Sequence, residues 1–185
     1  MNEQRIQIYA FLSRIYADVL DQESIEELGQ QGELLDQLGP ESRRYFAMAP
    51  DSRWLYEQLN TDFTSLFVMN NPPMERAVTD NGSDIYIGLE NPVMQFYLNH
   101  GYELNMNATH LMTPDHLALE LGFMEAMIRQ NDTDAQKEFL ATHLGHWAPP
   151  FLLGCKRAAQ TPFYQEICDF AAEFLISDYA ALESV

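Results

Sequence analysis

The segment MTPDHLALELGFM, from Met112 to Met124, combines a helix-start signal with apolar residues at helical spacing. Thr113 is suited to accept hydrogen bonds from the free N–H groups of a first helical turn, and Pro114 loses nothing there because those groups have no partner inside the helix. A carboxylate at Asp115 is favoured by the positive end of the helix dipole. We therefore predict that a helix begins at Pro114 and that its apolar residues lie in a core.

The same start signal recurs on both sides of this segment. Asn91-Pro92 and Thr161-Pro162 each place a capping side chain before a proline at the first helical position. The spacing of apolar residues predicts further helices at about residues 6–20, 24–38, 51–67 and 132–146, the second ended by Gly39-Pro40. The sequence thus predicts an all-α fold, a single helical bundle of roughly nine or ten helices.

The stretch from Asn70 to Glu90, NNPPMERAVTDNGSDIYIGLE, interrupts this pattern. It is rich in Asn, Pro, Gly and Asp and has no helical period, although a β-hairpin around Asn81-Gly82 is an option. We predict a long ordered loop that acts as a hinge between the N- and C-terminal halves of one domain spanning residues 1–185. Loops of this length are usually functional.

The composition favours some classes of partner over others. The 185-residue chain has 28 Asp and Glu against 10 Lys and Arg, which gives a net charge of −18. Such a surface repels nucleic acid and anionic membrane and attracts basic partners, although acidity that serves only solubility is the alternative. No run approaches the ~18 apolar residues of a membrane span. We predict a cytoplasmic protein, with Cys155 and Cys168 as buried free thiols and no signal peptide at the N-terminus.

His116 needs more explanation than its neighbours in the predicted first turn. A cation is disfavoured there, which should keep the imidazole neutral at pH 7 unless Glu120, four residues on and on the same face, offsets the effect. A neutral imidazole beside the carboxylate of Asp115 both donates and accepts hydrogen bonds. These residues are therefore candidates for a binding site, although ordinary helix-start chemistry accounts for most of them.

A second constellation suggests an enzyme as the alternative. His143 and His146 lie three residues apart near the predicted end of a helix, where they share a face and could ligate a metal together with scattered carboxylates. Histidines are also favoured near a helix C-terminus, and no motif completes a metal site. The following stretch from Trp147 to Phe151 is expected to close that helix and to place its two aromatic residues in the core. Phosphate-binding and nucleophile motifs are absent, so we predict no catalysis.

Four stretches, in order and spacing, resemble the TorD/DmsD/NarJ family of redox-enzyme maturation chaperones. They cover most of the chain from about Trp54 onward: LNTDFTSLFV (59–68), ENPVMQFYLNHGYEL (90–104), TPDHLALELGFM (113–124) and FLATHLGHWAPPFLLGCKRAAQTPFYQEICDFAAEFL (139–175). The third carries the family's Pro-Asp-His signature. The central loop departs from the family pattern, because Pro72 to Val78 contains no serine where the family often has a Pro-x-x-Ser-Val stretch.

The resemblance implies a function. Members of this family bind the N-terminal leader of a molybdenum-cofactor oxidoreductase subunit, often of the twin-arginine type, and hold the apo-subunit for cofactor insertion, assembly and export. Arginines pair well with carboxylates and the apolar part of a leader needs a hydrophobic groove, so an acidic, aromatic-rich helical protein suits both. The site residues implied for leader binding are Pro114, Asp115, His116, Glu120, Asp62, Phe67 and Glu75.

The same resemblance bears on the contacts and the partners. A helix N-terminus repels a guanidinium, so we expect Asp115 and His116 to contact peptide backbone or to fix the loop, with Asp62 and Glu75 sharing the arginines. The expected partner is the apo catalytic subunit of a molybdopterin oxidoreductase. No cofactor or metal is expected, and guanine nucleotide, suggested as an assembly signal in this family, is the weaker expectation. We expect a monomer, with a domain-exchanged dimer as the alternative.

Overall fold

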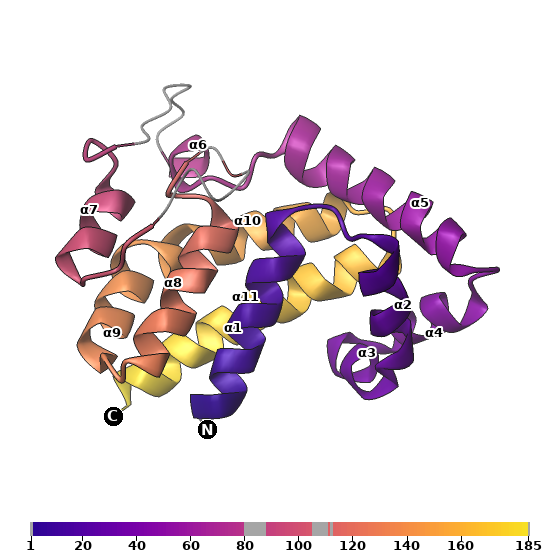
Figure 1. Ribbon diagram of the computed structural model, residues 1–185, viewed down its shortest axis with the longest axis horizontal. Coiled ribbons are helices and arrows are strands. Elements are labelled where there is room, and N and C mark those ends of the chain that lie inside the picture. Colours follow the sequence, from indigo (N-terminus) through magenta and orange to yellow (C-terminus); the bar gives the residue numbers. More distant parts are fainter. Residues whose placement is uncertain (1, 80–87, 105–110, 112, 185) are drawn as a thin grey trace. The chain divides into compact units, whose positions relative to one another are not determined.

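A computed structural model describes residues 2–79, 88–104, 111 and 113–184 (Figure 1). Within these residues the fold is all-α, as predicted, without a β-strand. The described helices, in chain order, are α1 (Asn2–Ala17), α2 (Gln22–Gln30), α3 (Gly32–Leu38), α4 (Pro40–Met48), α5 (Ser52–Phe63), the π-helical segment η1 (Thr64–Asn70), α6 (Glu75–Thr79), α7 (Pro92–Asn99), α8 (Leu117–Arg129), α9 (Thr133–Thr142), α10 (Leu144–Ala158) and α11 (Pro162–Glu183).

The chain forms two compact units. The first unit consists of Met1–Ala17, Pro73–Pro149 and Leu175–Val185, and the second unit of Asp18–Pro72 and Pro150–Phe174. Each unit is therefore assembled from segments that are far apart in the sequence. The prediction of one domain over residues 1–185 stays a prediction.

The core of the first unit is built around α8, which packs along α1 (Figure 1). Most side chains of α8 are buried, including Leu121, Phe123 and Met127, and such a helix is expected to lie inside a core. An aromatic cluster of Phe96, Tyr97 and Phe139 surrounds Phe123 at ring-centroid distances of 4.6 to 5.7 Å. The apolar run after His116 is thus core, as the sequence predicts.

A buried ion pair ties the chain ends of the first unit together. Arg5 on α1 donates two hydrogen bonds to Asp178 on α11, at 2.6 and 2.9 Å, and a third to Gln136 on α9. Tyr9 donates its hydroxyl proton to the same Asp178 carboxylate at 2.9 Å. Because every charged group here has a partner of opposite sign or a donor, we interpret this network as structural.

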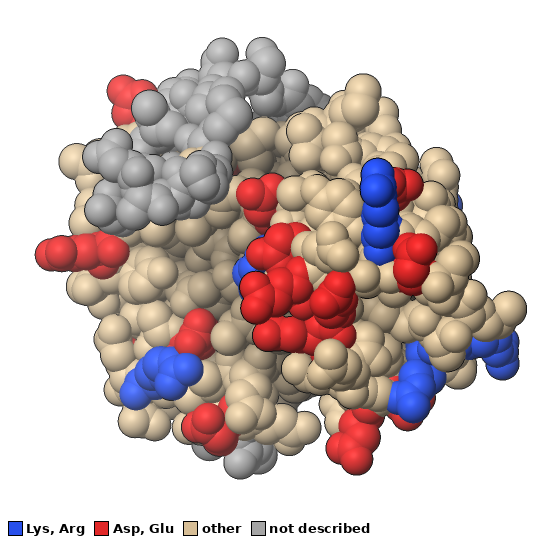
Figure 2. Space-filling view, turned by 45° about the vertical axis from the view of Figure 1, so that its right-hand side comes forward, with Lys and Arg blue, Asp and Glu red and all other residues tan. Residues whose placement is uncertain are grey.

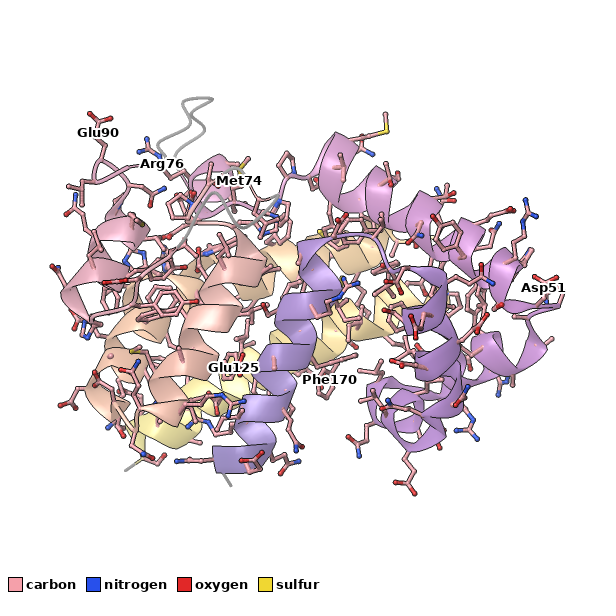
Figure 3. All side chains as sticks on the ribbon, viewed as in Figure 1. Asp51, Met74, Arg76, Glu90, Glu125 and Phe170 are labelled. Carbon is pink, nitrogen blue, oxygen red and sulfur yellow. The ribbon has the colours of Figure 1, made fainter. Side chains whose placement is uncertain are left out.

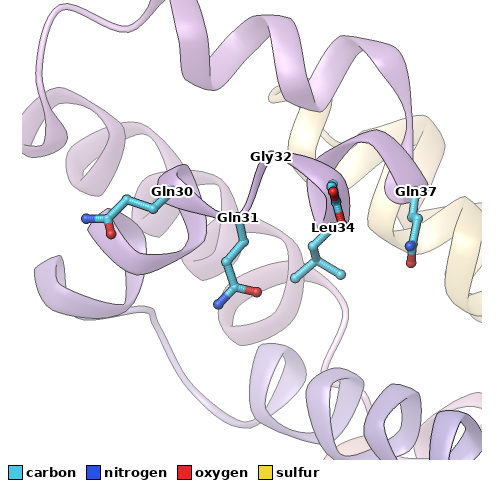
Figure 4. A pocket seen from close by; sticks show the side chains of 6 residues that line it. Gln30, Gln31, Gly32, Leu34 and Gln37 are labelled. Atoms are coloured by element: carbon cyan, nitrogen blue, oxygen red, sulfur yellow. The ribbon is translucent and has the colours of Figure 1, made fainter.

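The second unit has its own aromatic core. Phe63, Phe67 and Tyr164 lie within 5.2 to 6.0 Å of one another, and Phe46 packs against Phe163 at 5.7 Å. An open hollow on this unit has a volume of about 530 Å³ and is lined by the α2–α3 corner, Gln30 to Leu34 with Gln37 (Figure 4). Its lining is polar and it lacks an apolar floor that would hold a ligand.

Several predicted helix starts are confirmed. Asp51 accepts a hydrogen bond from the N–H of Trp54, and Asn91 accepts bonds from the first turn of α7. Thr161 Oγ1 faces the N–H of Tyr164 at 3.4 Å, next to Pro162 at the first position of α11. Asp132 caps α9, with its Oδ1 atom 3.0 Å from Ala135 N. These caps depend only on neighbouring residues and are therefore readable from the sequence.

The structure differs from the predicted helices in the first half of the chain. The helix expected over residues 24–38 is interrupted at Gln31, where the N–H of Gln31 bonds to Leu28 and α2 ends. The guanidinium of Arg43, the far end of a flexible and half-exposed side chain, lies where a Cβ on Gly32 would stand. The predicted loop also contains the five-residue helix α6. The option of a hairpin at residues 81–82 falls outside the described residues.

The boundary between α9 and α10 also differs from the prediction. His143 ends α9 with φ −126° and ψ −101°, and α10 begins at Leu144. The predicted helix does not continue to His146, and the stretch from Trp147 to Phe151 lies inside α10 rather than closing a helix. A Cβ on Gly145 would lie 2.4 Å from the carbonyl oxygen of Leu140, so the corner is too tight for another residue. Pro149 and Pro150 lie inside α10, although a proline within a helix costs about 3 kcal/mol, and Trp147 is buried.

The surface is strongly acidic. Red atoms of Asp and Glu outnumber blue atoms of Lys and Arg on the face seen in Figure 2. Both cysteines are buried free thiols, as predicted, and burial raises the pKa of Cys155 to about 12. Among the described residues, none of the helices is both long enough and apolar enough to cross a membrane.

Candidate functional site

The start of α8 is held by the segment that begins directly after Pro72, where the first part of the second unit ends. We call residues 73–79 the strap. Pro73 O accepts a hydrogen bond from Leu117 N at 2.8 Å, and Glu75 N donates to Asp115 O at 2.9 Å. Met74 and His116 form an antiparallel β-bridge between these two bonds. The strap therefore pairs with residues 115–117 as a short piece of β-ladder does.

This pairing corrects the predicted start of the helix. Pro114 and Asp115 form a turn, His116 is extended, α8 begins at Leu117, and its N-cap is His116 rather than Thr113. Thr113 is buried and its hydroxyl has no hydrogen-bond partner among the described residues. An extended backbone at His116 lets the strap bond to Asp115 and Leu117 on either side of it, which a helix starting at Pro114 would prevent.

Asp115 is buried beneath the strap. The residue is 2% exposed, and its Oδ2 atom accepts a hydrogen bond from the N–H of Arg76 at 3.2 Å. Oδ1 is buried as well and has no hydrogen-bond partner among the described residues. A buried carboxylate oxygen without a donor is costly, so Asp115 retains the capacity to accept a further hydrogen bond from a cation.

His116 is neutral at pH 7, as predicted. Its Nδ1 atom accepts a hydrogen bond from the N–H of Ala118 at 3.2 Å, which requires an unprotonated Nδ1. Burial lowers the pKa of His116 from 6.5 to about 4, and the negative charge of Asp115 opposes that shift only in part. Burial, rather than the helix dipole that the sequence suggested, is the main cause.

Glu120 lies fully buried in the first turn of α8. Its carboxylate accepts a hydrogen bond from Nε1 of Trp147, at 3.1 and 3.3 Å from the two oxygens. Burial raises the pKa of Glu120 well above its usual range, the negative charges of Glu75 and Asp115 raise it further, and the hydrogen bond from Trp147 lowers it. The three acids therefore lie close enough to feel one another's charge.

Glu75 connects the strap to the corner between α9 and α10. Its carboxylate oxygens lie 3.0 and 3.2 Å from Nδ1 of His143, and both side chains are 13% exposed. The imidazole of His143 packs between the rings of Phe96 and Phe139, at 5.6 and 5.3 Å. Glu75 is thus the acid that joins the predicted site to a histidine considered for a metal.

The site contains residues that sequence reasoning missed. His143, Trp147 and Tyr97 all contact it, Tyr97 through a hydrogen bond of 3.0 Å from its hydroxyl to Pro114 O. Burial raises the pKa of Tyr97 well above 10.0, with the charge of Glu120 as the next cause, so this hydroxyl stays a donor. These partners lie 17 to 68 residues away from the groups they contact, and no sequence motif joins them.

The structure assembles five of the seven predicted site residues in the first unit. Pro114, Asp115, His116, Glu120 and Glu75 form what we call the acidic site, to which the strap contributes Glu75; Met74 and Arg76 of the strap are labelled in Figure 3.

Asp62 and Phe67 belong to the second unit. Asp62 is 3% exposed and accepts hydrogen bonds from Gln160 N, from Thr161 N at 2.8 Å and from Thr161 Oγ1 at 2.7 Å. It therefore holds the turn that leads into α11. Phe67 is buried in the aromatic core of η1 and α11. Their predicted role in leader binding stays a prediction.

The described part of the chain offers no metal site. It contains no group of three or more His, Cys, Asp or Glu side chains arranged to hold a metal ion. His143 and His146 do not share a helix face as expected, because the break at His143 puts them in different elements. His143 is directed to Glu75, while His146 is exposed.

Comparison with family models places this geometry in context. The model of the nitrate reductase delta subunit matches residues 31–152, which is more than half of the chain and includes the strap and the acidic site. The chain belongs to the nitrate reductase delta subunit family. No curated protein and no solved structure gave a match.

The nitrate reductase delta subunit family is a family of molybdoenzyme maturation chaperones. The resemblance to the TorD/DmsD/NarJ chaperones is thereby confirmed. Its members act on nitrate-reductase-type molybdoenzyme subunits. Membership in this family gives the general role of a molybdoenzyme maturation chaperone, and the acidic site is the candidate for a specific mode of binding.

Proposed function

We propose that this chain binds the N-terminal leader of a molybdenum oxidoreductase subunit at the acidic site and holds the subunit for cofactor insertion and assembly. The observation that carries the proposal is Asp115. Its Oδ1 atom is buried and has no hydrogen-bond partner among the described residues. In a family of molybdoenzyme chaperones, a cationic group of the client is the donor that fits such an acceptor.

The chemistry of the surroundings supports a cationic ligand. Glu75 adds a carboxylate near Asp115, and Glu120 adds a buried carboxyl group whose pKa is raised by burial, while His116 is neutral at pH 7 and so contributes no compensating charge. A guanidinium offers up to five donors in a planar fork, which matches a carboxylate in two parallel hydrogen bonds. The net charge of −18 favours the approach of a basic leader from a distance.

Exposed apolar side chains on η1 are suited to contact the apolar stretch of a leader. Val68 and Met69, at the end of η1, are 61% and 75% exposed. They immediately precede the prolines that lead into the strap. These two side chains belong to the second unit, where they give η1 an exposed apolar surface of the kind that the apolar part of a leader needs.

Calorimetry with a synthetic leader peptide tests the proposal. The peptide carries a twin-arginine pair followed by an apolar stretch, and its control carries glutamines in place of both arginines. We expect the Asp115→Ala, His116→Ala double variant to bind the arginine peptide at least about tenfold more weakly, because a charge-assisted hydrogen bond is lost. Circular dichroism should show little loss of helicity. Unchanged affinity of the double variant would rule out the site assignment. Equal binding of the arginine and glutamine peptides would rule out the arginine pair as the group that the site recognises.

A further inference from the structure

The strap covers the carboxylate that the proposed function needs. Asp115 is 2% exposed, and one of its two oxygens already accepts the N–H of Arg76 in the strap. A guanidinium that binds Asp115 in two parallel hydrogen bonds needs both oxygens. Because Asp115 is 2% exposed beneath the strap, the strap has to move aside before a leader arginine reaches both oxygens.

The strap itself is weakly anchored. No residue of helix α6, which makes up most of it, is as buried as a core residue, and five residues are too few for a helix to be stable alone. Its anchors include Pro73, which is buried, the main-chain bonds to Asp115 and Leu117, and the side chain of Glu75. Segments with so few buried contacts belong to the part of a protein that opens most readily.

His143 provides a side-chain anchor of the strap. Its Nδ1 atom reaches both carboxylate oxygens of Glu75, and its ring is held between Phe96 and Phe139. The tight corner at Gly145 fixes the backbone just after it, since a Cβ there would meet the carbonyl of Leu140. His143 is thus rigidly aimed at Glu75, while Glu75 lies on the weakly anchored strap.

We propose that His143 is a positioning residue that holds the strap closed over Asp115, so that leader binding requires its contact with Glu75 to break. This inference rests on the proposed function. The strap then acts as an internal competitor that a leader with two strong cationic donors displaces and a weaker cationic segment does not. Releasing Glu75 also frees a second carboxylate for the incoming arginine.

The His143→Phe variant tests this arrangement. Phenylalanine keeps the ring between Phe96 and Phe139 and removes only the nitrogen that meets Glu75. Loss of one such contact makes the open state more populated, so we expect the arginine leader peptide to bind about fivefold to tenfold more tightly. A structural role alone predicts weaker binding or no change, because a destabilised site does not gain affinity.

His100→Phe is the matched control. His100 stacks on the same Phe96 at 4.4 Å and its Nδ1 atom lies 3.7 Å from a carboxylate, that of Asp132. None of its described contacts reaches the strap. The same substitution in the same aromatic cluster should therefore leave leader affinity at the wild-type value. A gain equal to that of His143→Phe would overturn the assignment.

Hydrogen–deuterium exchange of a peptide that covers residues 73–79 gives a second readout. We expect faster exchange of this peptide in His143→Phe than in the wild type, and faster exchange in the wild type when the arginine leader is added. Slower exchange on leader binding would overturn the proposal, because the strap would then close on the leader. Normal leader binding with unchanged affinity in His143→Phe would also overturn it and leave the proposed function standing. If neither the wild type nor His143→Phe binds the leader peptide, the strap proposal and the proposed function both fail.

Discussion

Asp62 in the second unit and Asp115 in the first are both buried aspartates next to a helix start, at 3% and 2% exposure. The carboxylate of Asp62 accepts hydrogen bonds from two backbone N–H groups and one hydroxyl. The carboxylate of Asp115 accepts one hydrogen bond, from the backbone N–H of Arg76 to Oδ2. Its Oδ1 atom has no hydrogen-bond partner among the described residues. Burial alone therefore does not distinguish a structural acid from a binding acid. The number of donors that the fold supplies to each oxygen does.

Replacing Asp62 by alanine should have the largest effect on stability. The change leaves the N–H groups of Gln160 and Thr161 without their acceptor, and unsatisfied buried donors are costly. We expect the free energy of unfolding to fall by about 4 kcal/mol, measured by urea denaturation. Leader affinity of the folded fraction should remain. A loss of affinity without a loss of stability would instead support the predicted role of Asp62 as an arginine partner.

The pH dependence of stability should report on His116. Its pKa is about 4 in the folded protein against an ordinary 6.5, so between these values the unfolded chain binds a proton that the folded protein does not. Stability should therefore fall as the pH drops from 6.5 to 4, by up to about 3 kcal/mol.

His116→Asn is the variant that isolates this effect. Asparagine keeps a capping acceptor for the N–H of Ala118 and does not titrate, so its acid-side slope in this window should be shallower than that of the wild type. Thermal unfolding at several pH values measures both proteins. Identical slopes would mean that the imidazole is not held neutral by burial.

Replacing Glu120 by glutamine should stabilise the protein at neutral pH. Burial raises the pKa of Glu120 above the ordinary 4.5, so as the pH rises past that value the unfolded chain releases a proton that the folded protein keeps. The native acid thus costs stability, which glutamine avoids while it still accepts the bond from Trp147. We expect a gain on the order of 1 kcal/mol at pH 7 that shrinks towards pH 4.5. A loss of stability would show that the charge is stabilised in the fold.

Asp115→Asn should have the smallest effect on stability and so completes the comparison. The amide oxygen can accept the N–H of Arg76, and the amide nitrogen takes the position of the unpaired Oδ1. We expect a change within about 0.5 kcal/mol, against roughly 2 kcal/mol for the same substitution at Asp62. Urea denaturation of the two variants side by side measures the difference. Equal losses would erase the distinction between the two aspartates.

Local chemistry explains which helix starts were predictable. Asp51, Asn91 and Thr161 cap their helices with side chains that reach two or three residues ahead, so neighbouring residues suffice. Thr113-Pro114 carries the same signal, yet the helix begins at Leu117. There the strap, about 40 residues earlier in the chain, pairs with the backbone of Asp115 and Leu117 and keeps His116 extended. A local signal fails where a distant segment competes for the same backbone groups.

Local pattern by itself determined the all-α class and the buried run of α8, and the resemblance of short motifs indicated the family and the residues of the candidate site. Those properties follow from periodicity, charge and short motifs, which neighbouring residues carry. The tertiary structure alone decided that His143 meets Glu75 across 68 residues, that Trp147 reaches Glu120, and that Asp62 is saturated with donors while Asp115 is not. Whether a buried acceptor finds a donor depends on what the folded chain brings within about 3 Å of it, and spacing along the chain does not contain that distance.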